Sequence, residues 1–124
     1  MSYETLYDEA FKVLGRFTLS RSNFSAGSVA SALITEEGNI FTGICIDVAC
    51  GMGFCAEHSA ISDMLKNRET RIKAIIAINP KQVMPPCGRC RELMYQINEE
   101  NLQTKVYLSE GKTKTLDELL PERY

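Results

Sequence analysis

Two cysteine motifs that are far apart in the sequence constrain this chain more than any other feature. The first is Cys55-Ala-Glu57, and the second is Pro86-Cys87-Gly-Arg-Cys90. The two sulfurs of a C-x-x-C turn can bind one zinc ion together, and zinc in proteins takes four ligands in a tetrahedron. A fold that brings Cys55 to Cys87 and Cys90 therefore places three thiolates on one metal ion and leaves a fourth position open.

An open fourth position is typical of a catalytic zinc site, whereas a structural site is closed. Zinc lowers the pKa of a water at that position to roughly 7, so that a nucleophile is available at neutral pH. Glu57 follows Cys55 in the first turn of a predicted helix, where its carboxylate can reach the water without binding the metal. Cys-x-Glu together with Pro-Cys-x-x-Cys is the pattern of zinc-dependent deaminases that act on nucleobases. We therefore expect Glu57 to be the catalytic acid and base, releasing ammonia from the substrate.

Positive charge beside the sulfurs is also expected. Three thiolates outweigh the two positive charges of zinc, and this excess would weaken the pull of the metal on a bound water. Arg89 and Arg91 lie in and directly after the C-x-x-C turn. We expect both arginines to donate hydrogen bonds to the ligand sulfurs, as outer contacts of metal sites commonly do.

Hydrophobic periodicity predicts an alternation of helices and strands. An apolar run from Ala74 to Ile78 is typical of a strand buried on both faces, so residues 71–78 should form the centre of a sheet. Helices are predicted to begin at both metal motifs. The predicted elements are a helix at 3–15, a polar loop at 17–27, strands at 28–35 and 39–46, helices at 55–67 and 87–97, a strand at 105–108, and a short strand and helical turn at 112–120.

This order predicts an α/β fold, a three-layer α/β/α sandwich with a mixed sheet of about five strands. The 124 residues, of which 44% are hydrophobic, can bury one core, so we expect a single domain over residues 1–124. The formal net charge of −2 provides no basic surface, so we expect a small-molecule partner and no nucleic acid. No long apolar run or export signal is present, which predicts no membrane contact and a cytoplasmic location. Five cysteines, an odd number, favour reduced thiols over a disulfide framework.

The chain resembles the cytidine deaminase family, and within it the blasticidin S deaminase branch. The resemblance rests on residues 24–33 (FSAGSVASAL), 38–43 (GNIFTG), 55–57, 86–91 (PCGRCR) and 119–124. It implies a cytidine deaminase-like fold, a Zn²⁺ ion bound by Cys55, Cys87 and Cys90, and Glu57 as the residue that carries protons. It also implies a nucleoside substrate, a place in pyrimidine salvage, and a homotetramer whose sites are completed by neighbouring subunits.

The resemblance also indicates residues that contact the substrate. Phe24 aligns with a phenylalanine that packs on the substrate, and Tyr124 matches a terminal aromatic residue that covers the base. Ala56, between the ligand and the glutamate, is a further candidate. Cytidine deaminases usually carry Asn-x-Glu on the second strand to bind the ribose hydroxyls, and this chain has Cys45 and Asp47 at those positions. We expect both to line the sugar end of the pocket, where at least one hydrogen bond to the sugar is missing, displaced or mediated by water.

Alternatives remain open for the metal and for the substrate. The zinc could be structural, closed by a fourth ligand from Cys45, Cys50 or His58, the only histidine in the chain. We expect deamination of cytidine or deoxycytidine. A second hypothesis keeps the chemistry but takes blasticidin S or another modified cytosine nucleoside as the substrate, and a third is a zinc-stabilised binding module without catalysis.

Overall fold

The computed structural model describes residues 3–124 and shows four helices, one 3-10 helix and six strands within them. The first half contains a helix, one short strand, a long hairpin and a second helix. The second half alternates strands and helices. In chain order the elements are α1 (Tyr3–Val13), β1 (Phe17–Thr18), β2 (Ser25–Thr35), β3 (Ile40–Asp47), α2 (Ala56–Lys66), β4 (Ile72–Ile78), α3 (Gly88–Ile97), η1 (Glu99–Gln103), β5 (Lys105–Ser109), β6 (Lys112–Thr115) and α4 (Leu116–Leu119).

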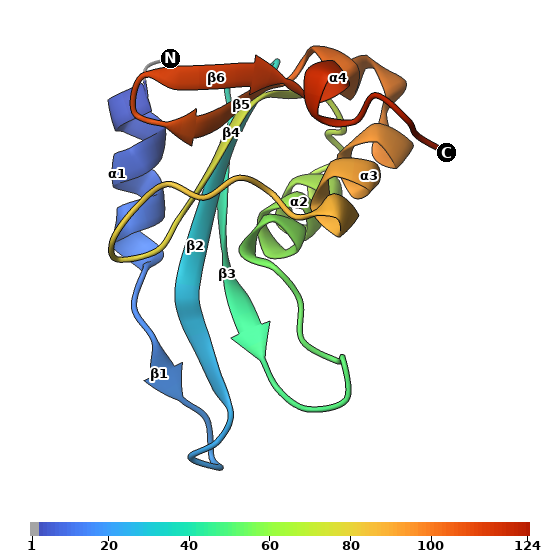
Figure 1. Ribbon diagram of the computed structural model, residues 1–124. Helices are drawn as coiled ribbons and strands as arrows, with labels where there is room; N and C mark the ends of the chain where they lie inside the picture. The colour runs from blue at the N-terminus through green and yellow to red at the C-terminus, as the bar shows by residue number, and fades with distance from the viewer. Residues whose placement is uncertain (1–2) are drawn as a thin grey trace.

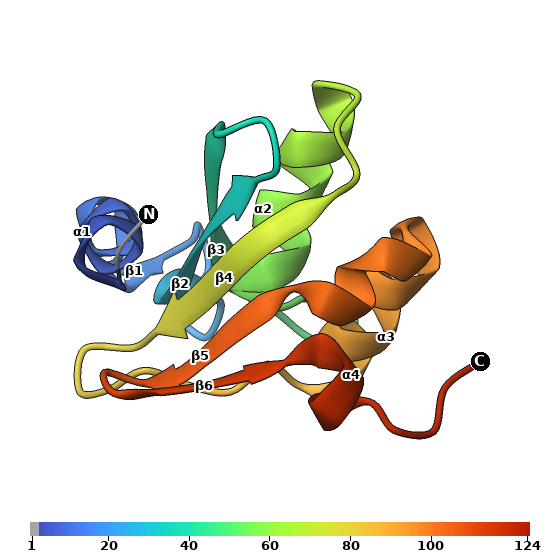
Figure 2. The same cartoon turned by 90° about the horizontal axis from the view of Figure 1, so that it is seen from above.

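The sheet is the middle one of three layers. Helix α1 covers one face, and α2 and α3 cover the other (Figures 1 and 2). The alternation of side chains along the strands explains this arrangement, because Ala74 and Ile76 of β4 pack in the cluster with α1, whereas Ile75 packs with α2 and α3. Each face of the sheet thus has its own apolar core. The predicted three-layer α/β fold is confirmed.

Strand β4 lies at the centre of a six-stranded mixed sheet. The strand order is β1-β2-β4-β5-β6, and β3 pairs with the other edge of β2. All pairs are antiparallel except β4 with β5, which are parallel. Parallel neighbours need a crossover connection, and α3 lies in this one. The crossover brings the start of α3, with the second metal motif, back to the sheet.

The expected polar loop at residues 17–27 is wrong at its two ends. Phe17 in β1 pairs with Ala26 near the start of β2. The strand predicted at 28–35 therefore begins earlier, at Ser25. The register of β2 against β3 shifts between Ala26 and Ala30. Because this irregularity interrupts the period of two, the pairing was not visible as an alternation of apolar residues.

Helix α2 is held close to β3 by a glycine. A Cβ atom on Gly43 would lie only 2.4 Å from the backbone nitrogen of Ala60 and 2.5 Å from Cβ of Ser59. Only glycine permits this approach. The contact sets the position of α2 on the sheet and, with it, the position of the first metal motif at the start of the helix.

No helix within residues 3–124 combines the length and the apolar composition that crossing a membrane requires.

Candidate metal centre

The three cysteines of the two motifs lie at the starts of two neighbouring helices. Cys55 is the N-cap residue of α2 and Cys87 is the N-cap residue of α3, and both have an extended backbone with φ of −73° and −70°. Cys90 follows in the first turn of α3 and is fully buried. Helix N-termini carry a partial positive charge that stabilises thiolates. The fold therefore places all three sulfurs where negative charge is favoured.

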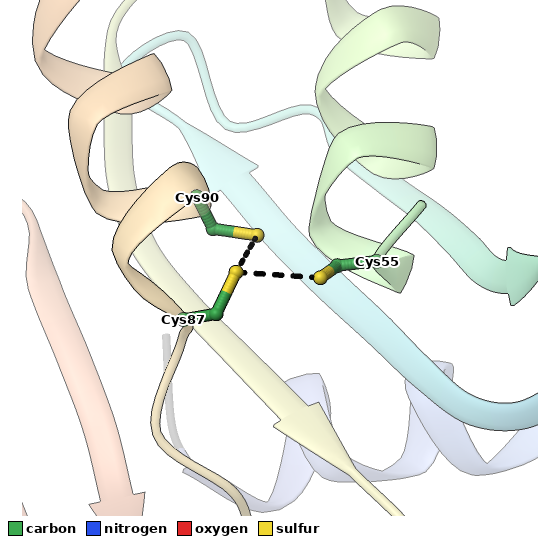
Figure 3. Close-up of side chains that lie close together, drawn as sticks. All are labelled: Cys55, Cys87 and Cys90. Atoms are coloured by element: carbon green, nitrogen blue, oxygen red, sulfur yellow. Dashed lines mark hydrogen bonds between the residues drawn. The ribbon is translucent and has the colours of Figure 1, made fainter. Parts of the chain in front are cut away.

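The three sulfur atoms converge on one point (Figure 3). Sγ of Cys87 lies 3.4 Å from Sγ of Cys55 and 3.5 Å from Sγ of Cys90. In a tetrahedral zinc site with Zn–S bonds of about 2.3 Å, sulfur atoms are about 3.8 Å apart. The donor type and the spacing therefore fit a zinc ion, with a small outward movement of the sulfurs.

The alternative of a closed structural site finds no fourth ligand in this geometry. Among residues 3–124, the group whose ligand atoms all lie within 4.8 Å of one another contains Cys55, Cys87 and Cys90 alone. Cys45, Cys50 and His58, the three residues considered for the fourth position, do not join it. A site with three protein ligands is the arrangement of catalytic zinc.

The surroundings shift the pKa values of the three thiols in different directions. Burial raises the pKa of the Cys55 thiol to about 11, with a further contribution from Cys87. Burial also raises the pKa of Cys90, and the charge of Glu57 adds to the shift. Burial acts on Cys87 in the same direction, but hydrogen bonds, first of all from the backbone of Cys90, outweigh it and lower the pKa. Burial disfavours the charged thiolate, but a thiol that coordinates a metal loses its proton. A cation at the point where the sulfurs converge would stabilise the buried thiolates.

Glu57 is a buried carboxyl group beside the sulfurs. It lies in the first turn of α2, and only 4% of its surface is exposed. Burial raises its pKa above the usual range, whereas a hydrogen bond with Cys90 acts in the opposite direction. A carboxyl group whose pKa is raised toward the working pH can both accept and donate a proton.

Cys55, Cys87 and Glu57 line a pocket of about 460 Å³, and Cys90 lies buried behind them. This volume is within the range of small-molecule sites. The lining includes Ala56, the first residue of α2, and Arg89 of the C-x-x-C turn. Cys45 and Asp47 of β3 also line it, so the structure brings these four candidates together with the ligands and the glutamate.

A hydrogen-bonded group on β2 and β3 forms part of the pocket wall. The hydroxyl of Ser28 lies 3.2 Å from Sγ of Cys45 and donates to the carboxylate of Asp47 at 3.2 Å. Sγ of Cys45 also donates to Asp47 at 3.4 Å and accepts from the backbone N–H of Val29 at 3.3 Å. Sequence reasoning missed Ser28, because the register irregularity in β2 hides which residues face Cys45. The available signal was a serine directly after Gly27, opposite the two residues that replace the usual ribose-binding pair.

Three other candidates lie elsewhere in the chain. Phe24 is outside the pocket lining and packs under the guanidinium of Arg21, 5.5 Å from the ring centre. Tyr124 is 98% exposed at the end of a C-terminal segment that points away from the sheet (Figure 2). The guanidinium of Arg91 donates to the carbonyl oxygens of Pro86 and Leu119 at 2.8 and 3.0 Å, which ties the start of α3 to α4.

His58 contacts the centre without belonging to the ligand group. Its Nδ1 atom lies 3.3 Å from Sγ of Cys90. Burial, and then the charge of Arg89, lower the pKa of the imidazole. Neutral imidazole is thereby favoured near pH 7.

Comparison with known proteins places this geometry in a family. Residues 2–106 match the family described as the cytidine and deoxycytidylate deaminase zinc-binding region. A cytidine deaminase of Halalkalibacterium halodurans is 33% identical over 104 residues, which cover 79% of this chain and 77% of that protein. A blasticidin-S deaminase of Bacillus cereus is 26% identical over 106 residues, 77% of this chain and 76% of that protein.

A solved structure shares the fold over nearly the whole chain. The crystal structure of cytidine deaminase from Mycobacterium leprae superposes with a TM-score of 0.82 at 27% identity, covering 98% of this chain and 99% of that one. The resemblance found in the sequence and the zinc cofactor are thus confirmed. The chain belongs to the cytidine and deoxycytidylate deaminase family, whose members are zinc-dependent hydrolases that act on C–N bonds.

Proposed function

We propose that this chain deaminates a cytosine nucleoside, converting cytidine or deoxycytidine and water to uridine or deoxyuridine and ammonia. One observation carries the proposal: three cysteine sulfurs converge on one point, and two of these cysteines, Cys55 and Cys87, line the same pocket as the buried Glu57. The relatives named cytidine deaminase support the choice of base and sugar. The 460 Å³ pocket has room for a nucleoside.

Cys55, Cys87 and Cys90 are the proposed ligands of the zinc ion. The mutual distances of their sulfur atoms support this set, as does the absence of a fourth ligand atom in the group within residues 3–124. When bound, zinc supplies the Lewis acidity that makes water nucleophilic near neutral pH. Arg89, which lines the pocket, and Arg91, which fixes the start of α3, are proposed to offset the negative charge of the thiolates.

Glu57 is proposed to move two protons during the reaction. It takes one proton from the attacking water and delivers it to the ring nitrogen next to the carbon that carries the amino group. It then takes the remaining proton from the hydroxyl that has added to this carbon and delivers it to the amino group, which leaves as ammonia while the carbonyl forms. Its burial beside the sulfurs supports this role, because a carboxyl group with a raised pKa can act in both directions.

The sugar is proposed to bind at the wall formed by Ser28, Cys45 and Asp47, with Ala56 against the base. Ser28 donates to one carboxylate oxygen, Oδ2 of Asp47, so the other oxygen is available to accept from a sugar hydroxyl. Cys45 already bonds within the wall, and its thiol is a weak partner. Asp47, supported by Ser28, would therefore make the main sugar contact.

The active protein is proposed to be a homotetramer with shared sites. Tyr124 is 98% exposed, and Met52 and Phe54, on the loop beside the pocket, are 71% and 37% exposed. Tyr124 would cover the base in a neighbouring subunit, and Phe24 would pack against substrate at the same boundary. Light scattering of the purified protein tests the tetramer, and a monomer with full activity would refute the sharing of sites.

Each chain is proposed to be one domain, to act in the cytoplasm and to serve pyrimidine salvage. Two apolar clusters on the two faces of one continuous sheet support a single folding unit. All five cysteines are unpaired, as is usual in a reducing compartment.

Blasticidin S is the second candidate substrate. The relative from Bacillus cereus carries that name, and Cys45 and Asp47 stand where cytidine deaminases usually have the Asn-x-Glu pair that binds ribose. Neither feature requires a change in the chemistry at the sulfurs.

Ammonia release by zinc-loaded protein from cytidine, deoxycytidine, cytosine and blasticidin S tests these proposals together. Turnover of cytidine or deoxycytidine supports the first. Turnover of blasticidin S alone replaces it with the second. If none of the four releases ammonia while one zinc is bound per chain, the deaminase proposal fails for these substrates and the remaining hypothesis is a zinc-stabilised binding module.

A further inference from the structure

His58 joins the two helices that carry the metal motifs. It lies in the first turn of α2, where its backbone N–H donates to the carbonyl of Cys55 at 3.1 Å. Its Nδ1 atom lies 3.3 Å from Sγ of Cys90 on α3. One side chain thus connects the helix that begins at the first ligand to the sulfur of the third.

The imidazole ring is held from a second direction. It stacks on Phe54 with the ring centres 6.2 Å apart and the planes 17° apart. Phe54 is itself fixed, because its backbone exchanges hydrogen bonds of 3.0 and 3.1 Å with Ile46 of β3. The ring is therefore oriented by the stack and by the sulfur contact at the same time.

The chemistry of the sulfur determines the direction of this hydrogen bond. A cysteine that binds zinc does so as a thiolate, which has no proton to donate. Sγ of Cys90 can then only accept, so the hydrogen must be on Nδ1 of His58. Cys90 is the one fully buried cysteine of the three, so bulk water does not solvate the charge of its sulfur.

We propose that His58 is a positioning residue of the metal centre, which donates its Nδ1 hydrogen to the Cys90 thiolate and holds that sulfur in place for zinc. The inference rests on the proposed ligand set of Cys55, Cys87 and Cys90. It assigns a specific contact to the only histidine in the sequence. Metal ligands are commonly oriented by such outer hydrogen bonds, whose loss weakens metal binding by roughly 10–100-fold.

The tautomer of His58 is directly measurable, because this is the only histidine in the sequence. Long-range ¹H–¹⁵N spectra of zinc-loaded protein with ¹⁵N-labelled histidine report one imidazole without assignment. We expect a protonated Nδ1. A neutral ring protonated at Nε2, or two nitrogens averaged by exchange between tautomers, would overturn the inference.

Two variants separate the hydrogen bond from the packing of the ring. His58→Phe keeps a ring to stack on Phe54 but lacks the donor, whereas His58→Asn retains an N–H in place of Nδ1–H. We expect zinc affinity, measured by competition with a chelator, to fall about 10–100-fold in His58→Phe and to recover most of this loss in His58→Asn. The thiolate-to-metal charge-transfer band of the cobalt-substituted protein should shift in His58→Phe and return toward its original energy in His58→Asn.

A failure of the role of His58 can be distinguished from an error in the proposed ligand set. If Cys87→Ser binds zinc as tightly as the unmodified chain, the proposed ligands are wrong. If Cys87→Ser loses zinc but His58→Phe has unchanged affinity and an unchanged cobalt band, the ligands stand and the role of His58 is refuted. Should His58→Phe not fold, the tautomer of the unmodified protein still decides.

Discussion

Sγ of Cys55 and Sγ of Cys87 lie 3.4 Å apart, although the two residues are the N-caps of different helices and the central strand β4 lies between them in the sequence. The close packing of α2 on β3 places the first sulfur, and the crossover from β4 to β5 places the second. The position of the sulfurs therefore depends on the whole fold. Substitutions at the sulfurs and substitutions at distant packing sites should both weaken zinc binding.

Replacing a ligand sulfur should remove the metal. Serine at position 87 substitutes a poorly ionised hydroxyl for a thiolate, so zinc binding in Cys87→Ser should weaken by more than the 10–100-fold expected for an outer contact. Zinc content after dialysis against a chelator measures this loss. The matched control is Cys50→Ser, because Cys50 is exposed and outside the ligand group. Equal loss of zinc from both variants would contradict the assignment.

Adding one methyl group at Gly43 should displace α2. The new Cβ would overlap the backbone of Ala60, which cannot move away as a flexible side chain can. We expect Gly43→Ala to lower the free energy of unfolding by about 1–3 kcal/mol and also to weaken zinc binding, because Cys55 begins the displaced helix. Urea denaturation and chelator competition measure the two effects. Gly111→Ala is the control, since nothing lies within 4 Å of a Cβ there, and it should leave both quantities unchanged.

Much of the fold was predictable because its signals are local. The apolar run Ala74–Ile78 identified the central strand, and both helices of the metal motifs begin within one residue of the prediction. The pairing of Phe17 with Ala26 was missed because β1 has only two residues, too few to show an alternation, and because the register of β2 against β3 shifts directly after Ala26.

The candidate site divides in the same way. The spacing of Cys55, Cys87 and Cys90 predicted a group that the structure brings together. The contact of Ser28 with Asp47 joins different strands across an irregular register, so no motif records it. Arg91 donates to the carbonyl of Leu119, at the end of α4. The position of Arg91 next to Cys90 in the sequence does not predict this tertiary contact.

Asn101 should be among the most sensitive positions for stability. Its fully buried amide accepts from the backbone N–H of Ile72 at 2.8 Å and donates to the carbonyls of Thr70 and Met94 at 3.0 and 2.9 Å. Asn101→Ala leaves these groups without partners, at about 1–3 kcal/mol each, so we expect a total loss of about 3 kcal/mol or more in the free energy of unfolding. Asn98→Ala, which removes an exposed cap of η1, should cost about 0.5–2 kcal/mol. A smaller loss in Asn101→Ala than in Asn98→Ala would refute this account.

Ser28 should affect binding of the sugar more than the chemical step. Without its hydroxyl, Asp47 loses one hydrogen bond worth about 0.5–1.5 kcal/mol, so KM for cytidine should rise about 2–10-fold in Ser28→Ala while kcat changes little. Steady-state kinetics separate the two constants. Ser109→Ala, at the exposed end of β5, serves as the control. A fall in kcat at constant KM would argue against a sugar contact at this wall.

Zinc content and ammonia release of Glu57→Gln, compared with the unmodified chain, test the central claim most directly. Glutamine keeps the shape of the side chain but cannot carry a proton between water and base. The account predicts one zinc per chain in both proteins and a loss of deamination of about 10²–10⁴-fold in the variant. Deamination of cytidine by Glu57→Gln within tenfold of the unmodified rate, at equal zinc content, would contradict it.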